Sequence, residues 1–154
     1  MKNLIPLNEV FITTFEEVAS AKSSERRERL FNLKPFIESR YKDYLLQKIN
    51  LEVLGETLIR GSAEAIDLQH CYDVATIPLK KLKERIDSIQ SEARCQYCGI
   101  DQTNALDHYL PKTGFPEFSM LAINLIPSCG RCNLLKGDRW LLDGKRSVLN
   151  LYFD

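Results

Sequence analysis

Up to about residue 90, apolar residues recur every three or four positions, the spacing that gathers them on one face of a helix. This pattern predicts helices over residues 11–19, 24–33, 35–55, 62–74 and 76–89. After Arg94 the helical period disappears, and Cys, Pro, Gly and Asn become frequent. The change predicts a mainly α chain that ends in a small α+β unit. We place the boundary near Ser91, between a helical region of residues 1–91 and a second domain of residues 92–154.

Some of the predicted helices carry start signals. Thr13, with Glu16 three residues later, has the spacing of a capping box, in which two side chains bond backbone N–H groups at a helix start. Ser62 and Thr76 stand directly before apolar-periodic segments, and both are favourable N-cap residues. We therefore expect helices to begin at these positions.

The third predicted helix is the longest. Pro35 suits its first turn, and Gly55 suits its end. One apolar face is expected to enter the core and comprises Tyr41, Tyr44, Leu45 and Ile49. The predicted helices carry no chemical motif, so their apolar faces indicate packing rather than catalysis.

The balance of charge restricts how the chain can meet a partner. Its 154 residues carry 21 basic and 21 acidic side chains, a formal net charge of zero. A surface for a polyanion therefore has to be a local patch. No apolar run approaches the roughly 20 residues of a membrane span, and polar residues interrupt the first segment where a signal peptide would have its apolar core. We therefore expect a cytoplasmic protein with no membrane partner.

Four of the five cysteines form two C-x-x-C pairs, Cys95 with Cys98 and Cys129 with Cys132. Four thiolates in two such turns are the soft, tetrahedral ligand set that zinc prefers. The alternatives are redox dithiols or buried free cysteines, but the segment lacks the βαβ pattern of thioredoxin-like proteins. We therefore predict one structural zinc ion, with Gly99 and Gly130 supplying the positive φ angles of the tight turns.

Polar residues follow a particular order between and after the two cysteine pairs. The order is Asp107-His108-x-x-Pro111, then Asn124-Leu125, then the second cysteine pair, then Asn133-x-x-Lys136-Gly137. Over roughly 45 residues of this chain, the order resembles that of the HNH nuclease family. The resemblance implies a ββα-metal fold, with strands near residues 104–110 and 124–127 and a helix over residues 130–142.

The residues that carry the resemblance also suit phosphodiester hydrolysis by their own chemistry. His108 titrates near neutral pH and can take a proton from water, and the resemblance makes it the general base. Asp107 and Asn133 offer the hard oxygen atoms that Mg²⁺ or Mn²⁺ prefers. Because neighbours on a strand point to opposite faces, Asp107 and His108 can share a site only where the strand is distorted or ends. The resemblance gives Asn124 a structural role, in which it holds the loop between the strands through backbone hydrogen bonds.

Basic residues near these motifs are candidates for phosphate contact. Lys136 and Arg139 lie on the predicted last helix, and Lys112 follows the Asp-His pair; all three are predicted to contact nucleic acid. A further basic run lies on the helix that leads into the cysteine segment and comprises Lys80, Lys81, Lys83 and Arg85. This run has two interpretations, a solvated helix face or phosphate contact beside the active site.

These features together predict a metal-dependent endonuclease that hydrolyses nucleic acid, with DNA favoured, in a setting such as restriction or phage defence. Two alternatives stay open. One is a nucleic-acid-binding zinc module without catalysis, which would have no need of Asp107, His108 and Asn133. The other is a protein-interaction module in which zinc is a scaffold and residues 1–91 bind a partner protein or a second copy of the chain.

Overall fold

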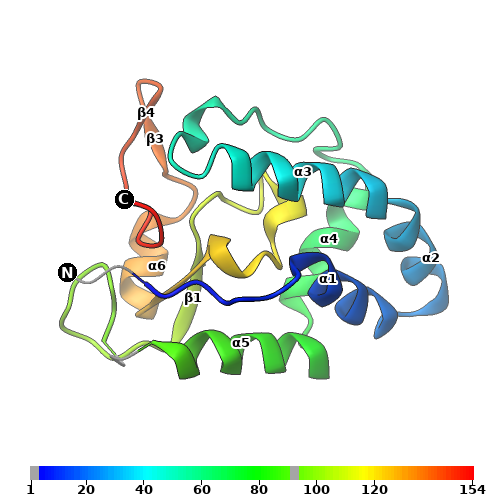
Figure 1. Cartoon of the computed structure of the whole chain (residues 1–154), viewed down its shortest axis with the longest axis horizontal. Coiled ribbons are helices and arrows are strands. Elements are labelled where there is room, and N and C mark those ends of the chain that lie inside the picture. Colours follow the sequence, from blue (N-terminus) through cyan, green and yellow to red (C-terminus); the bar gives the residue numbers. More distant parts are fainter. Residues whose placement is uncertain (1–3, 91–93) are drawn as a thin grey trace.

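The structure is a computed structural model that describes residues 4–90 and 94–154. In these ranges the chain is mainly α-helical, with two small antiparallel sheets (Figure 1). The α-helices are α1 (Phe11–Ser20), α2 (Ser24–Asn32), α3 (Lys34–Leu46), α4 (Ala63–Asp73), α5 (Ile77–Ile89) and α6 (Gly130–Lys136). The strands are β1 (Ala105–His108), β2 (Leu125–Ser128), β3 (Leu141–Leu142) and β4 (Lys145–Arg146). Short 3₁₀ helices lie at η1 (Leu51–Val53), η2 (Pro116–Phe118) and η3 (Ala122–Asn124). None of the described helices is long and apolar enough to cross a membrane.

The predicted starts of α4 and α5 are confirmed. The Ser62 hydroxyl accepts a hydrogen bond from the Ala65 N–H at 3.3 Å, and the Thr76 hydroxyl accepts one from the Leu79 N–H at 3.4 Å. Each bond satisfies a backbone donor that has no partner inside its own helix. The serine and the threonine thereby fix where both helices begin.

The capping box predicted at Thr13 is wrong. The first helix begins earlier, at Phe11, and its N-cap residue is Val10, which makes no side-chain cap bond. The Thr13 N–H instead donates to the Val10 carbonyl at 2.9 Å, so Thr13 lies inside the first turn. A capping box needs its threonine in front of the helix, and this position does not provide that.

The third helix is shorter than predicted, because the chain turns to bury a later leucine. It ends at Leu46 rather than near Gly55. Two residues assigned to its buried face are exposed, Leu45 at 41% and Ile49 at 57%. Leu51, which follows the turn, is fully buried. Breaking the helix therefore places Leu51 in the core, a gain that helical spacing alone does not reveal.

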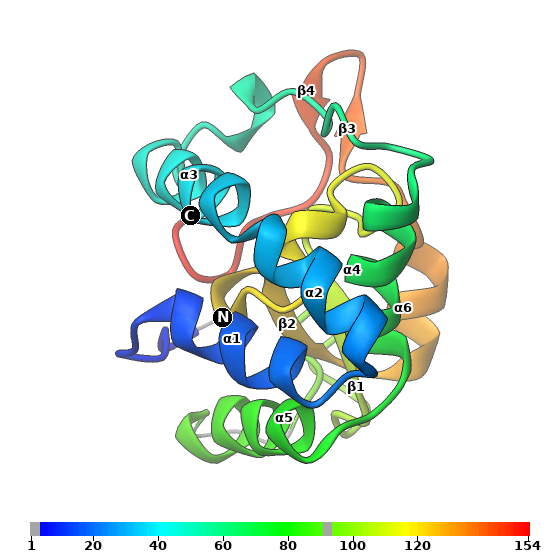
Figure 2. The same ribbon diagram turned by 90° about the vertical axis from the view of Figure 1, so that its right-hand side faces the viewer.

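One hydrophobic core joins the helices to the C-terminal part of the chain. Phe15, Leu68 and Leu82 from the helices belong to the same buried cluster as Leu106 and Ile126 of the hairpin. The hairpin and the segment between its strands lie between α3 and α5, as Figure 1 and the rotated view in Figure 2 both show. The predicted boundary near Ser91 itself falls in residues 91–93, outside the described residues. The residues before it and after it share a core.

The C-terminal hairpin and helix follow in the predicted order, but the helix is shorter than predicted. Strands β1 and β2 pair antiparallel, with Asp107 opposite Ile126. The following helix, α6, ends at Lys136 rather than near Leu142. The next residue, Gly137, has φ of +50°, a conformation that glycine adopts readily and that ends helices. The two leucines before Lys136 are exposed, so a longer helix would bury nothing on that side.

The last residues of the chain pack against the core without forming a strand. The Leu4 N–H donates to the Leu151 carbonyl at 2.7 Å. The Tyr152 hydroxyl donates to the Leu125 carbonyl of β2 at 2.9 Å. Leu151 and Tyr152 are both buried. The C-terminal segment thus supports the hairpin from the side of β2.

Candidate metal centre and active-site cleft

The four predicted zinc ligands lie together. The Sγ atoms of Cys95, Cys98, Cys129 and Cys132 are all within 4.8 Å of one another. Bonds of about 2.3 Å to a tetrahedral zinc ion would place sulfur atoms roughly 4 Å apart. The cluster therefore has the composition and the size to hold one metal ion such as zinc.

One of the two glycines predicted to have positive φ does so. Gly99 has φ of +68° in the first cysteine turn, where its N–H donates to the Cys95 carbonyl at 2.8 Å. The prediction for Gly130 is wrong, because Gly130 is the first residue of α6 and is helical. Its N–H donates to the Asn104 side-chain oxygen at 2.7 Å. That bond ties the start of α6 to the residue in front of β1.

The electrostatics of the cysteine cluster favour a cation. Backbone N–H groups of Asp101 and Ile100 lower the pKa of Cys98 to about 7. Burial and the three neighbouring cysteines raise the pKa of Cys132 to about 12. Thiolates this close repel one another, and a bound cation removes the repulsion. The cluster can therefore ionise fully only around a metal ion.

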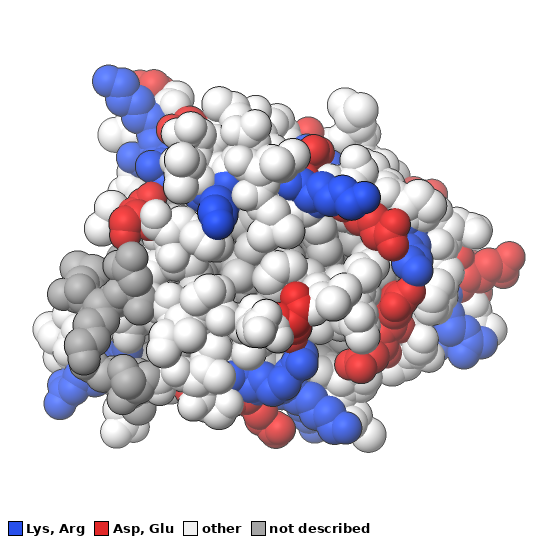
Figure 3. Space-filling view, in the orientation of Figure 1, with Lys and Arg blue, Asp and Glu red and all other residues white. Residues whose placement is uncertain are grey.

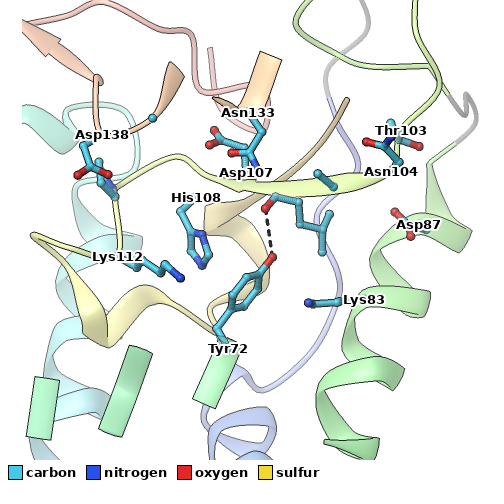
Figure 4. A pocket seen from close by; sticks show the side chains of 14 residues that line it. Tyr72, Lys83, Asp87, Thr103, Asn104, Asp107, His108, Lys112, Asn133 and Asp138 are labelled. Carbon is cyan, nitrogen blue, oxygen red and sulfur yellow. Dashed lines mark hydrogen bonds between the residues drawn. The ribbon is translucent and has the colours of Figure 1, made fainter. Parts of the chain in front are cut away.

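A cleft of about 450 Å³ lies beside β1. From β1, the loop after it and α6, its lining includes Asp107, His108, Lys112 and Asn133. The opposite wall comes from the helical region, with Tyr72 at the end of α4 and with Lys83 and Asp87 on α5 (Figure 4). The structure thus brings three of the predicted catalytic residues and one predicted nucleic-acid contact into one cleft. Tyr72, Lys83 and Asp87 of the helical region complete the lining of this cleft.

His108 is the last residue of β1, where the strand ends, so it lines the same cleft as its neighbour Asp107. The His108 Nε2–H donates to the Ser119 carbonyl at 3.0 Å, because a carbonyl can only accept. In the neutral ring this leaves Nδ1 as the proton acceptor. The Tyr72 ring packs against the imidazole in a T-shaped arrangement, with ring centroids 4.3 Å apart. Burial lowers the pKa of His108 to about 3, and the Ser119 carbonyl opposes this shift. The ring is therefore neutral at physiological pH, and its burial weakens it as a base until a nearby negative charge offsets the desolvation.

Asp107 is held by a half-buried tyrosine and a buried lysine. The Tyr97 hydroxyl donates to Oδ2 at 2.7 Å, and the Lys136 ammonium lies 3.1 Å from the same oxygen. Burial raises the pKa of the Asp107 carboxyl, while Lys136 and Tyr97 oppose this shift. Lys136 also donates to the His108 carbonyl at 2.6 Å. The structure therefore places Lys136, predicted to contact nucleic acid, in the interior as the ion-pair partner of Asp107.

Asp107 and Asn133 carry oxygen atoms of the type that hard divalent cations bind. A carboxylate has about four lone-pair positions. Tyr97 and Lys136 occupy both positions on Oδ2, and Lys136 takes one on Oδ1 at 3.3 Å. The His108 backbone N–H is a further donor to this carboxylate, so a cation would have to displace one of these donors. Asn133 of α6 lines the same cleft as Asp107 (Figure 4). Carboxylate and amide oxygens are ligands that Mg²⁺ accepts, with water completing its coordination.

Asn124 is fully buried and bridges both ends of the loop between the strands. Its Oδ1 accepts from the Leu110 N–H at 2.8 Å. Its Nδ2 donates to the Leu110 carbonyl at 3.1 Å and to the Phe118 carbonyl at 3.2 Å. The same loop carries Ser119, whose carbonyl orients His108. The asparagine therefore holds the segment that fixes the imidazole.

We expect Asn124→Ala to lower stability and activity together. The alanine leaves the two Leu110 groups and the Phe118 carbonyl without partners, at a cost of about 2–4 kcal/mol. The loosened loop should slow any reaction that uses His108 without altering the cation requirement. Urea unfolding and a Mg²⁺ titration of activity check this prediction. A variant as stable as the wild type would show that these bonds do not support the loop.

The other two predicted nucleic-acid contacts lie in different places. Lys112 lines the cleft and forms an ion pair with Asp73 at the end of α4. Arg139 is exposed beyond α6 and does not line the cleft; its Nε donates to the Lys136 carbonyl at 3.3 Å. On the face drawn in Figure 3, basic and acidic side chains are interspersed. The drawn face therefore carries charges of both signs rather than one continuous basic surface.

Two residues of the site carried no signal that identified them, and a third carried an ambiguous one. Tyr97 stands inside the first C-x-x-C pair, and nothing in that motif assigns it to Asp107. Tyr72 lies in a helix without a motif, and only the tertiary fold brings it to His108. Lys83 belongs to the basic run on α5, for which phosphate contact was one of two interpretations.

The chain is similar in sequence to Protein ea31 of Escherichia phage lambda. It is 41% identical over 103 residues, which cover 64% of this chain and 35% of the relative. The chain therefore spans about a third of the length of the curated relative it matches. No family model matches the chain, and no solved structure does.

Proposed function

We propose that the chain is a metal-dependent endonuclease that hydrolyses phosphodiester bonds of nucleic acid, with DNA as the favoured substrate. The observation that carries the proposal is the placement of His108. Its Nε2 is fixed by a backbone carbonyl, its Nδ1 is available to accept a proton, and it shares a cleft with Asp107 and Asn133. The order of these residues resembles the HNH nuclease family, which supports the same reaction. A role in restriction or phage defence stays a prediction.

In the proposed reaction, His108 takes a proton from a water molecule in the cleft. The oxygen of that water attacks the phosphorus, and the bond from phosphorus to the 3′ oxygen breaks. Asp107 and Asn133 would hold Mg²⁺ or Mn²⁺, which stabilises negative charge on the phosphate and on the departing oxygen. Burial keeps the imidazole neutral before the reaction. The Ser119 carbonyl stabilises the protonated ring after it has accepted the proton.

We also propose that the four-cysteine cluster holds a structural zinc ion. The chemistry of the cluster supports this, since four thiolates leave no open position for a substrate. The two cysteine turns flank β1 and the start of α6, so the ion would connect the two elements that carry His108 and Asn133. Catalysis and zinc binding would then be separate functions of one small unit.

A non-catalytic nucleic-acid-binding module is the second candidate. One observation favours it: Lys136 already neutralises Asp107, as a cation at the same carboxylate would. In that case the cleft would bind a phosphate without cutting it. The prediction that residues 1–91 bind a partner protein or a second copy of the chain stays a prediction.

The test of the proposed function is a cleavage assay across substrates. The zinc-loaded chain is incubated with supercoiled plasmid, single-stranded DNA and RNA, with and without added Mg²⁺ or Mn²⁺. Divalent cation is withheld by dialysis rather than by a chelator, because a chelator would also remove structural zinc. Cleavage that needs added cation supports the nuclease. Binding of all substrates without cleavage of any favours the binding module.

We further expect Tyr72 to position the base. Tyr72→Phe keeps the ring against His108 and loses only the hydroxyl bond to the Leu106 carbonyl, so it should cleave at nearly the wild-type rate. Tyr72→Leu removes the ring, and misplacement of a catalytic group lowers rates by up to about 10²-fold. The readout is kcat for both variants beside their zinc content. Equal rates for Phe and Leu would remove Tyr72 from this role.

A further inference from the structure

The helical region contributes a half-buried lysine to the cleft. Lys83 projects from α5 into the cleft that His108 and Asp107 line. Its Nζ lies 4.2 Å from the centre of the Tyr72 ring. The same ring makes a T-shaped contact with His108. A single aromatic side chain therefore separates this ammonium group from the proposed base.

Lys83 has no carboxylate partner among the residues that the structure describes. In this respect it differs from Lys112, which pairs with Asp73, from Lys136, which pairs with Asp107, and from Arg85 on the same helix, which pairs with Glu9 at 2.9 Å. Burial lowers the pKa of Lys83, Asp73 opposes that shift, and Lys112 adds to it. A partly buried ammonium without a counter-ion gains when an anion approaches. The aromatic ring holds the charge in place without satisfying its hydrogen-bond donors.

A second ammonium group lies over the same ring. Lys112 Nζ is 5.7 Å from the Tyr72 ring centre. In Figure 4 the two lysines stand on opposite sides of Tyr72, with His108 above it. Asp73 offsets one of the two charges and Asp138 also lines the cleft, so the positive charge is confined to the two ammonium groups beside Tyr72. Asp87, one turn after Lys83 on α5, also lines the cleft and limits that charge.

A nucleic-acid strand suits this arrangement better than a single small anion. A strand in a duplex carries one phosphate per about 3.4 Å of helix axis, so neighbours of the scissile phosphate lie close to it. The Tyr72 ring lies between Lys83 and His108. Lys83 is therefore placed to contact a phosphate next to the scissile one rather than the scissile phosphate itself. Phosphate contacts of this kind set the position of the strand and carry no sequence preference.

We propose that Lys83 and Lys112, on either side of Tyr72, bind a backbone phosphate next to the scissile one. The helical region thus supplies one wall of the substrate site and selects where the strand enters. This inference rests on the proposed function and names the side chains that recognise its substrate. The other basic residues of the α5 run, Lys80 and Lys81, are exposed and do not line the cleft.

The test is the salt dependence of DNA binding by the full zinc-loaded chain. A short fluorescent DNA duplex is titrated without added Mg²⁺ or Mn²⁺, at several salt concentrations between about 50 and 200 mM. Lys83→Met keeps the apolar stem over Tyr72 and removes the charge, and Lys80→Met is the matched control on the same helix. We expect the slope of log K against log salt to fall by about one for Lys83→Met. For Lys80→Met it should stay at the wild-type value.

Asp73→Asn provides a test in the opposite direction. Asp73 is half exposed, so the change should leave the fold intact. Freed from its carboxylate, Lys112 should bind DNA more tightly and with a steeper salt slope. The inference is overturned if Lys83→Met keeps the wild-type slope or if Asp73→Asn binds no more tightly. If the wild-type chain cleaves with added cation and these variants bind unchanged, this inference alone is wrong. If the wild type neither binds nor cleaves DNA, the proposed function fails with it.

Discussion

Cys95→Ser is expected to abolish zinc binding and to destabilise the whole chain. A structural zinc ion supplies roughly 10–16 kcal/mol in small zinc-finger peptides, as much as the entire stability of a typical domain, about 5–15 kcal/mol. The cysteine cluster adjoins a hairpin whose Leu106 and Ile126 belong to the common core. Loss of the ion should therefore weaken the packing of the helices as well. We expect the midpoint of thermal unfolding to fall by at least about 10 °C.

The matched control is Cys71→Ala, since Cys71 is buried in α4 far along the chain from the cluster. Elemental analysis should give one zinc ion per chain for the wild type and for Cys71→Ala, and close to none for Cys95→Ser. Retained zinc in Cys95→Ser would contradict the assignment. Disulfides among the four clustered cysteines in a fresh reduced sample would contradict it too.

Replacing His108 is expected to cause the largest loss of activity that leaves the metal sites intact. Loss of a general base costs about 10²–10⁴-fold in rate. His108→Ala also removes the bond to the Ser119 carbonyl and the contact with Tyr72, so a second variant is needed. His108→Gln keeps an N–H donor for that carbonyl and lacks a basic nitrogen. Both variants should bind zinc and DNA as the wild type does, because neither change touches a cysteine or a cleft lysine.

Local signals of the sequence predicted much of the fold. Ser62 and Thr76 act on the backbone within three residues, so their capping roles are readable without the rest of the molecule. The two C-x-x-C pairs are local in the same sense, and two tight turns supply the whole ligand set. The His108-Asp107 pair was also identified, and its stereochemical conflict is solved because His108 ends its strand.

Helix ends were harder to predict where packing decides them. Apolar residues continue at helical spacing after Leu46, but α3 ends there and the chain turns to bury Leu51. At the other end, Gly137 was part of the recognised order of residues and also carried the stop signal for α6. A helix extending to residue 142 was predicted although Gly137 is a residue type that commonly ends helices.

The side chains around the cleft depended on tertiary contacts that a sequence does not display. Lys136 was predicted to contact nucleic acid because it follows Asn133 at helical spacing, yet its ammonium is buried against Asp107. The approach of α4 to β1 brings Tyr72 to His108 across 36 positions of the chain. No periodicity or motif encodes that approach, which follows from how α4 and α5 bury their apolar faces.

The central claim is that His108 acts as the base of a cation-dependent phosphodiester hydrolysis. Its most direct test is the initial rate at which the zinc-loaded chain nicks supercoiled plasmid, measured for the wild type and for His108→Gln with and without added Mg²⁺ or Mn²⁺. The account predicts that the wild type nicks only with added cation and that His108→Gln is slower by at least about 10²-fold. A folded, zinc-loaded His108→Gln that nicks plasmid at the wild-type rate would contradict it.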